Sequence, residues 1–234
     1  MELRLLVIRH GATAYSQERR YAGSHDIPLS PEGRRQCSAL AQALGSLHAA
    51  AVYASPLVRA RESAAPIAAA QGIEVTLESD FREMCFGDWE GLTRDEVERR
   101  FPEYFKRWLT EPERFARPGS EPLGAVAERV TRAVAELRAT HLGETVILVS
   151  HGVVTRLIVL AALGLGPERL WSVDASPAGI SEIEYRDDWA TVHRVNTVAH
   201  LTSWGASEGP PNHPDARSAP GNPGHSSNPL WPRE

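Results

Sequence analysis

Short apolar runs alternate with helix signals along this chain, and this alternation constrains the fold more than any other feature of the sequence. Buried strands are predicted from the apolar runs at residues 3–8, 50–54, 73–77 and 145–149. Helices are predicted from capping signals and helical spacing at residues 31–47, 56–71, 120–143 and 153–163. Strands that alternate with helices are typical of an α/β fold in three layers, with a mostly parallel central sheet and helices on both faces.

The predicted helix starts carry residues that satisfy free backbone N–H groups. A serine followed by proline marks two of them, with Ser30 and Ser55 as the predicted N-caps. Thr93 and Glu96 have the spacing of a capping box at a further helix. The helix after Ser30 is expected to bury one face, which comprises Leu40, Ala43, Leu44 and Leu47.

The C-terminal part of the chain contains a strand pair and then changes in composition. Residues 180–185 and 191–195 are predicted to form a hairpin at a sheet edge. Ten of the 29 residues from position 206 to the end are Pro or Gly, so this segment cannot bury enough apolar surface to offset its chain entropy. We therefore predict one catalytic domain over residues 1–204 and a disordered tail over residues 205–234.

Charge, apolar runs and cysteine usage limit the partners and the location of the protein. The net charge of −5 lacks the basic surplus that is typical of nucleic-acid-binding proteins. The longest apolar run, residues 153–166, contains Arg156 and is too short to span a bilayer. Cys37 and Cys85 form no disulfide framework and match no metal-ligand spacing, which is typical of a reducing compartment. The sequence therefore predicts a cytoplasmic protein that binds neither nucleic acid nor membrane.

Polar residues follow three of the predicted strands. Arg9 and His10 follow the first strand, Arg59 lies in the helix after the second, and His151 follows the strand at residues 145–149. In open α/β sheets, ligands bind beyond the carboxyl ends of the strands. Helix N-termini and guanidinium groups at that edge suit a phosphate. Each residue alone is more often structural, but their coincidence at one edge predicts a phosphate site.

A series of short motifs follows along the chain: Leu6-Val7-Ile8-Arg9-His10-Gly11-Ala12-Thr13, Tyr21-Ala22-Gly23, Ile27-Pro28-Leu29-Ser30-Pro31-Glu32-Gly33, Ala54-Ser55-Pro56-Leu57 with Arg59-Ala60, Phe81-Arg82-Glu83, Phe86-Gly87-Asp88-Trp89-Glu90-Gly91, and Val149-Ser150-His151-Gly152. With these motifs in this order, the sequence resembles the histidine phosphatase superfamily, also called the phosphoglycerate mutase-like family. The match extends over about residues 3 to 201.

The resemblance implies a phosphoglycerate mutase-like fold and a phosphatase that hydrolyses small phosphate monoesters without a cofactor or a metal. It implies that His10 becomes phosphorylated and that Glu83 is the general acid and base. It also implies that the phosphoryl oxygens are held by Arg9, Arg59 and His151. Ser16 stands where the family often has an asparagine that binds phosphate. The expected partner is a small phosphorylated metabolite.

The chemistry requires a neutral His10, because only an unprotonated ring nitrogen can attack phosphorus. Positive neighbours such as Arg9 and Arg59 disfavour the imidazolium form, so we expect the pKa of His10 to be low. Because an alkoxide is a poor leaving group, Glu83 is expected to donate a proton to it and then to accept one from water.

Three alternative functions share part of this pattern. A cofactor-dependent phosphoglycerate mutase usually has a longer, basic stretch after its catalytic glutamate, whereas here the compact sequence from Phe86 to Thr93 resembles the phosphatase branch. A phospho-ligand-binding module without catalysis should lack His10 or Glu83, and both are present. A metallohydrolase is disfavoured because none of the nine histidines forms a His-x-x-x-His or Asp-rich pair. The substrate and the oligomeric state stay open.

Substrate specificity is expected to come from the segment between Glu83 and Ser120. Its aromatic residues are predicted to form either part of a lid or a second small hydrophobic cluster. These residues are Phe86, Trp89, Phe101, Tyr104, Phe105, Trp108 and Phe115.

Overall fold

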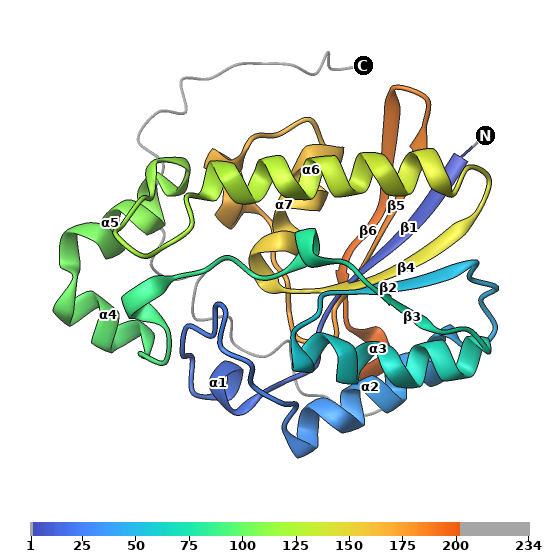
Figure 1. Cartoon of the computed structure of the whole chain (residues 1–234), viewed down its shortest axis with the longest axis horizontal. Coiled ribbons are helices and arrows are strands. Elements are labelled where there is room, and N and C mark those ends of the chain that lie inside the picture. The colour runs from blue at the N-terminus through green and yellow to red at the C-terminus, as the bar shows by residue number, and fades with distance from the viewer. Residues whose placement is uncertain (1, 202–234) are drawn as a thin grey trace, which may run out of the picture. The chain divides into compact units, whose positions relative to one another are not determined.

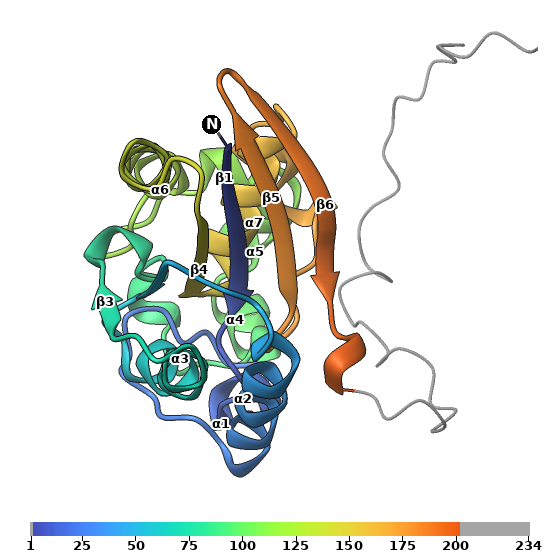
Figure 2. The same cartoon turned by 90° about the vertical axis from the view of Figure 1, so that its right-hand side faces the viewer.

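The computed structural model describes residues 2–201, which contain one six-stranded sheet of order β3-β2-β4-β1-β5-β6. The strands are β1 (Glu2–Arg9), β2 (Ala51–Ala54), β3 (Val75–Leu77), β4 (Thr145–Ser150), β5 (Ile180–Arg186) and β6 (Trp189–Thr197). The first four pair in parallel, while β5 and β6 form an antiparallel hairpin at one edge (Figure 2). The predicted mostly parallel α/β sheet and its edge hairpin are confirmed.

Helices cover the two faces of this sheet. They are α1 (Ala14–Gln17), α2 (Pro31–Leu44), α3 (Val58–Gln71), α4 (Arg94–Arg100), α5 (Pro102–Thr110), α6 (Leu123–Thr140) and α7 (Gly152–Ala162). Five short 3-10 turns join them, at η1 (Ser79–Phe81), η2 (Gly87–Trp89), η3 (Pro112–Arg114), η4 (Pro167–Ser172) and η5 (Ala199–Leu201). Figure 1 shows α4 and α5 at the end of the molecule opposite to the N-terminus.

Strand β1 explains why three layers form. Successive side chains of a strand point to opposite faces of the sheet. Leu5 and Val7 pack in one cluster with residues of α6 and α7, whereas Leu6 and Ile8 pack in another with residues of α2 and α3. Both faces of β1 are therefore buried, which accounts for its unbroken apolar run.

Helix α3 begins later than the sequence predicts. Its N-cap is Leu57, which makes no side-chain capping bond, and not Ser55. The Ser55 hydroxyl lies 2.7 Å from a ring nitrogen of His151 and accepts a weaker bond from the Leu57 N–H at 3.3 Å. The Ser55 hydroxyl, which the local sequence predicts to be a helix cap, thus contacts His151 from a distant part of the chain instead.

The other capping predictions are confirmed. Ser30 accepts from the Gly33 N–H at the start of α2, and Thr93 forms a capping box with Glu96. Helix α2 ends at Leu44, three residues earlier than predicted, and Ala43 is exposed rather than buried. The apolar stripe of α2 is therefore narrower than its sequence suggests.

The aromatic residues after Glu83 do not form a separate cluster. Trp89 and Trp108 are fully buried, and their rings lie 4.9 Å from that of Phe115. Trp108 also meets Trp171 of η4 at 5.1 Å between ring centroids. The group is continuous with the core that packs under α6 and α7, so the prediction of a second small cluster is wrong. A role as a lid stays a prediction.

The predicted disordered tail, residues 205–234, and the domain boundary at 204 lie outside the described residues. Within residues 2–201, no helix has the length and apolar character needed to cross a bilayer.

Candidate active site

Two histidines meet where β1 and β4 end side by side. Arg9 and Ser150 are partners in the parallel register, so the next residue of each strand, His10 and His151, leaves the sheet at the same level. The His10 N–H also donates to the carbonyl of Ser150 at 2.9 Å. The two imidazole centroids lie 5.1 Å apart, with the ring planes inclined by 61°. Strand pairing thus brings together residues that are far apart in the sequence.

The ring of His10 has one nitrogen fixed by its own backbone. Nδ1 lies 2.7 Å from the carbonyl oxygen of Gly11, and because a carbonyl can only accept, Nδ1 carries the proton. Nε2 of the neutral ring therefore holds a lone pair. Burial, followed by the charges of Arg59 and Arg9, lowers the pKa of His10 well below its ordinary value, against a smaller opposing effect of the Gly11 bond. The expected low pKa is found, so the imidazole is neutral at pH 7.

The ring of His151 is held at both nitrogens. Arg59 donates from Nε to Nδ1 at 3.2 Å, and an arginine can only donate, so the proton of neutral His151 sits on Nε2. Nε2 donates to the Ser55 hydroxyl at 2.7 Å. Burial and the nearby Arg59 lower the pKa of His151 well below its ordinary value. His151 is therefore neutral and oriented.

Arg59 is fully buried and has most of its direction fixed by the protein. Besides the bond to His151, Nη1 donates to the carbonyl of His25 at 2.7 Å and Nη2 to the carbonyl of Gly23 at 2.8 Å. A guanidinium has five N–H bonds, so two remain for a ligand. Burial lowers the pKa of Arg59, while the carboxylate of Glu83 acts in the opposite direction.

Ser63 ties the turn that carries His10 to the helix that carries Arg59. Its hydroxyl accepts from the Gly11 N–H at 3.0 Å and donates to the Arg59 carbonyl at 2.7 Å. A Cβ at Gly11 would lie 2.7 Å from the carbonyl oxygen of Gly33, so only glycine fits there. The sequence analysis missed Ser63, although its place one helical turn after Arg59 is readable.

Arg9 is held more loosely and next to another cation. Nη1 donates to the Ala175 carbonyl at 2.5 Å, while the buried Nε has no hydrogen-bond partner within residues 2–201. A Cβ at Gly152 would lie 3.7 Å from Cζ of Arg9 and 3.6 Å from Nη1 of Arg156, so the two guanidinium groups meet over this glycine. Burial, followed by the charge of Arg156, lowers the pKa of Arg9 to about 10. Two positive charges thus lie close together in this corner of the site, while Glu83 and Asp174 act on Arg9 in the opposite direction.

Arg156, Val173, Asp174 and Asn196 lie behind Arg9 and were not predicted as parts of the site. Arg156 interrupts the apolar run of α7, and a buried arginine needs partners. It donates from Nε to the Val173 carbonyl at 2.8 Å, and its Nη2 lies 3.5 Å from Asp174. Asp174 in turn accepts from Asn196 of β6 at 2.9 Å.

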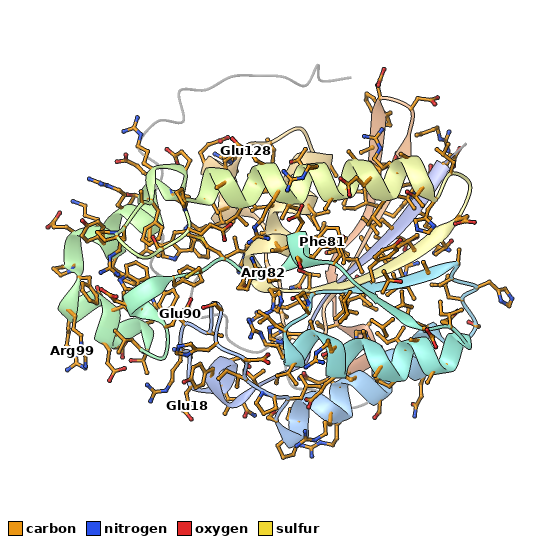
Figure 3. All side chains as sticks on the ribbon, viewed as in Figure 1. Glu18, Phe81, Arg82, Glu90, Arg99 and Glu128 are labelled. Carbon is orange, nitrogen blue, oxygen red and sulfur yellow. The ribbon has the colours of Figure 1, made fainter. Side chains whose placement is uncertain are left out.

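The Glu83 side chain contacts the first turn of α7. Its Oε1 accepts from the Met84 N–H at 3.0 Å, and its Oε2 accepts from the Val153 N–H at 3.4 Å. The side chain is half-buried. The neighbouring Arg82, labelled in Figure 3, is exposed and donates to the Ser79 carbonyl. The Glu83 carboxyl therefore lies at the N-terminus of α7, whose N-cap is His151.

Ser16 has a local role in the described structure. Its hydroxyl accepts from the Thr13 N–H at 2.8 Å and donates to the Thr13 carbonyl at 2.9 Å, which completes the capping box of α1. Its place as a phosphate ligand stays a prediction.

These groups supply a nucleophilic nitrogen, cationic donors and a carboxyl in one place. A neutral imidazole can attack phosphorus, and guanidinium groups match the geometry of phosphoryl oxygens. Among residues 2–201, no group of three or more His, Cys, Asp or Glu side chains has an arrangement that would hold a metal ion. The arrangement is suited to phosphoryl transfer.

Comparison with known proteins agrees with this chemistry. Residues 5–198 match the histidine phosphatase superfamily (branch 1). Phosphoserine phosphatase 1 of Hydrogenobacter thermophilus is 34% identical over 199 residues, which cover 85% of this chain and 94% of that protein. The solved structure of Bacillus stearothermophilus YhfR has a TM-score of 0.81 at 31% identity, over 86% of this chain and 100% of that one. A mycobacterial glucosyl-3-phosphoglycerate phosphatase in complex with VO3 has a TM-score of 0.77 at 28% identity, over 82% and 98%.

The chain therefore belongs to the histidine phosphatase superfamily, branch 1, as its motifs predict. With relatives and structural neighbours that are named phosphatases, it is a phosphoric monoester hydrolase.

Proposed function

We propose that this enzyme hydrolyses small phosphate monoesters through a phosphohistidine on Nε2 of His10. The observation that carries this proposal is the bond between Nδ1 of His10 and the Gly11 carbonyl. It leaves the lone pair on Nε2, and the low pKa keeps that lone pair free of a proton at neutral pH. Attack of Nε2 on phosphorus forms the N–P bond while the ester P–O bond breaks.

Arginines supply the positive charge that the reaction needs. The transition state of phosphoryl transfer spreads charge over three equatorial oxygens. The unpartnered Nε of Arg9 and the remaining N–H bonds of Arg59 are donors for these oxygens. Because the donors are largely fixed before substrate arrives, they need little reorganisation. No metal ion takes part in the proposed mechanism. His151 would join them by rotation of its ring, which would move the Nε2–H from the Ser55 hydroxyl to a phosphoryl oxygen.

Glu83 provides the proton for the leaving group. In the first step its carboxyl protonates the alkoxide, and in the second it accepts a proton from the water that attacks phosphohistidine. Its bond to the Val153 N–H in the first turn of α7 supports this role, because that helix begins directly after His151. The result is one alcohol and one inorganic phosphate per turnover, with His10 regenerated.

The substrate is proposed to be a small phosphorylated metabolite. The relatives that carry the comparison are named for phosphoserine and glucosyl-3-phosphoglycerate, both small phosphate esters. A cytoplasmic location is part of the proposal, since Cys37 and Cys85 are both free thiols.

The test is capture of the intermediate by rapid quenching in base after mixing with substrate. We expect acid-labile phosphate on His10, located by mass spectrometry of the digested protein. His10→Asn should abolish both the label and turnover, whereas His48→Asn, at an exposed histidine of the loop after α2, should keep both. Glu83→Gln should slow label formation from an alkyl phosphate by about 10²–10⁴-fold, and far less from p-nitrophenyl phosphate, whose leaving group needs no proton.

Label on a serine or an aspartate would contradict the proposal, as would turnover by His10→Asn. Equal losses on both substrates in Glu83→Gln would assign the proton transfer to another residue.

A further inference from the structure

Glu90 has an unusually well-satisfied carboxylate for a residue outside the proposed reaction. Its side chain is only 6% exposed, and a buried carboxylate is costly unless it is hydrogen-bonded. Oε1 accepts from the N–H groups of Phe86 at 2.9 Å and Ser24 at 3.0 Å, and Oε2 accepts from the Ser24 hydroxyl at 2.7 Å. Burial alone would raise the pKa of Glu90, but the bonds from Ser24 and Phe86 lower it, so the group is ionised at pH 7.

Ser24, which donates two hydrogen bonds to Glu90, lies between the two residues whose carbonyls accept from Arg59. Gly23 and His25 each accept from one terminal nitrogen of the Arg59 guanidinium, and Ser24 is the residue between them. The contact is close, because a Cβ at Gly23 would lie 2.0 Å from Oε1 of Glu90. Gly23 also has φ of +47°, in the left-handed region that favours glycine. The backbone therefore passes directly against the carboxylate.

The segment that carries Glu90 is itself docked on the same loop. The Gly91 N–H donates to the Tyr21 carbonyl at 2.8 Å. The Tyr21 ring meets those of Phe86 and Trp89 at 5.0 and 5.1 Å. Figure 3 shows Glu90 beside the loop that follows α1. Ring packing and this hydrogen bond thus hold the segment that carries Glu90 against the loop that carries Ser24.

We propose that Glu90 is a positioning residue for Arg59, and that it acts through the loop of residues 23–25. A guanidinium is planar, so the acceptors of three of its N–H bonds set the direction of the other two. Release of Ser24 would let the Gly23 and His25 carbonyls move and would turn the free N–H bonds of Arg59 away from the phosphoryl oxygens. A misplacement of about 1 Å can cost about 10²-fold in rate. This inference rests on the proposed function, since Arg59 is taken to bind phosphate.

Two substitutions separate the hydrogen bonds of Glu90 from its charge. In Glu90→Gln the amide oxygen can accept from both N–H groups, and the amide nitrogen can donate to the Ser24 hydroxyl, which accepts as well as donates. Glu90→Ala removes all three bonds. We expect Glu90→Gln to stay within about 3-fold of wild type in kcat/KM and in affinity for orthovanadate. We expect Glu90→Ala to lose about 10–100-fold in both.

A control carboxylate lies on the neighbouring helix. Glu96 caps α4 through the Thr93 N–H and makes no bond to residues 23–25 among the described contacts. Glu96→Ala should lower the melting temperature but leave vanadate affinity and kcat/KM unchanged. A loss in vanadate affinity by Glu96→Ala equal to that by Glu90→Ala would overturn the proposal, because any weakening of the segment would then be enough.

Coupling to Arg59 is the decisive measurement. In an Arg59→Lys background, whose ammonium cannot use both carbonyls as the guanidinium does, Glu90→Ala should have almost no further effect on vanadate affinity. In an Arg9→Lys background its full effect should remain. Additive losses with Arg59→Lys would overturn the proposal, and so would equal damage from Glu90→Gln and Glu90→Ala. If Glu90→Ala does not fold, Ser24→Ala, which removes one bond, takes its place with an expected loss of about 3-fold.

Vanadate affinity does not depend on a covalent intermediate. Absence of phosphohistidine in wild type would therefore refute the proposed function and leave the coupling result standing. Absence of coupling alongside normal phosphohistidine would refute only the role of Glu90.

Discussion

The two sides of the proposed phosphate site are built differently. On the α3 side, Arg59 is fully buried and donates to three fixed acceptors, and Ser63 joins its helix to the His10 turn. On the α7 side, Arg9 is half-buried and has one carbonyl partner, an unpartnered Nε and the like charge of Arg156 beside it. On the α3 side the protein thus provides acceptors for three of the five N–H bonds of Arg59, whereas on the α7 side Arg9 has one acceptor and lies beside a like charge, with Glu83 and Asp174 acting in the opposite direction.

This difference separates two properties that active-site mutations often confound. An arginine with three acceptors inside the protein is expected to contribute to folding as well as to the proposed catalysis. An arginine with one acceptor and a like charge beside it is expected to contribute less to folding. The two arginines should therefore have similar effects on turnover but different effects on stability.

The largest expected effect comes from a comparison of Arg59→Ala with Arg9→Ala. Each should lower kcat/KM by about 10²–10³-fold or more, because each removes a preorganised donor. Arg59→Ala should also lower the free energy of unfolding by about 3–6 kcal/mol, since two buried acceptors, on His151 and Gly23, and one part-buried acceptor, the His25 carbonyl, lose their donor. Arg9→Ala should cost about 1 kcal/mol or less, since one carbonyl loses a donor while the repulsion from Arg156 ends.

Urea unfolding of both variants, beside steady-state kinetics, checks this prediction. Equal losses of stability would show that the two sides do not differ as the hydrogen bonds indicate.

A smaller effect is expected from pH. His10 and His151 have pKa values well below 6.5 in the folded protein, so below that pH the unfolded chain binds protons that the folded chain does not. Their contribution to stability is therefore complete above pH 6.5 and is lost as the pH falls. Between pH 7.5 and 5.5 each should account for a loss of about 1.4 kcal/mol in the free energy of unfolding.

Urea unfolding at pH 7.5 and 5.5 measures this loss in the free energy of unfolding. The loss should be about 1.4 kcal/mol smaller in His10→Gln than in wild type. The same loss in both proteins would mean that His10 titrates normally in the folded state. In the comparison of the two sides, an ordinary pKa for His10 would show that burial and the charges of Arg59 and Arg9 do not lower the pKa of this ring.

The smallest effect is expected from Ser16→Ala, which tests whether a third group belongs to the site. The hydroxyl is used in the capping box of α1, so its loss should cost about 1 kcal/mol of stability. KM should change by less than about 3-fold. A tenfold rise in KM for several phosphate esters would show that the hydroxyl leaves Thr13 to bind phosphate, as the family resemblance implies.

The parts of the site that the sequence predicts are those that strand order controls. His10, Arg59 and His151 follow strands whose carboxyl ends must meet at one edge, so their proximity needs no knowledge of side-chain packing. Arg156 was visible as a charge in an apolar helix, but its partners Val173 and Asp174 come from an irregular loop that no periodicity predicts.

The missed features depend on contacts between distant segments. Ser55 looks like a helix cap, yet it contacts His151 instead, because the partner comes from β4. Glu90 belongs to a recognisable motif, but its hydrogen bonds with Ser24 depend on how that motif packs against the loop after α1. Local signals determine which elements form, while the second layer of polar contacts emerges only when the elements are assembled.

The close approach of Gly23 and Glu90 has a consequence for how this sequence can diverge. Any side chain at position 23 must displace the carboxylate, and φ of +47° disfavours most residues there in any case. A lineage that has lost Glu90 can accept Asn or Asp at position 23, since these residues tolerate the left-handed region. The two positions are distant in the chain, yet we expect the residue at each of them to limit which residues the other can accept.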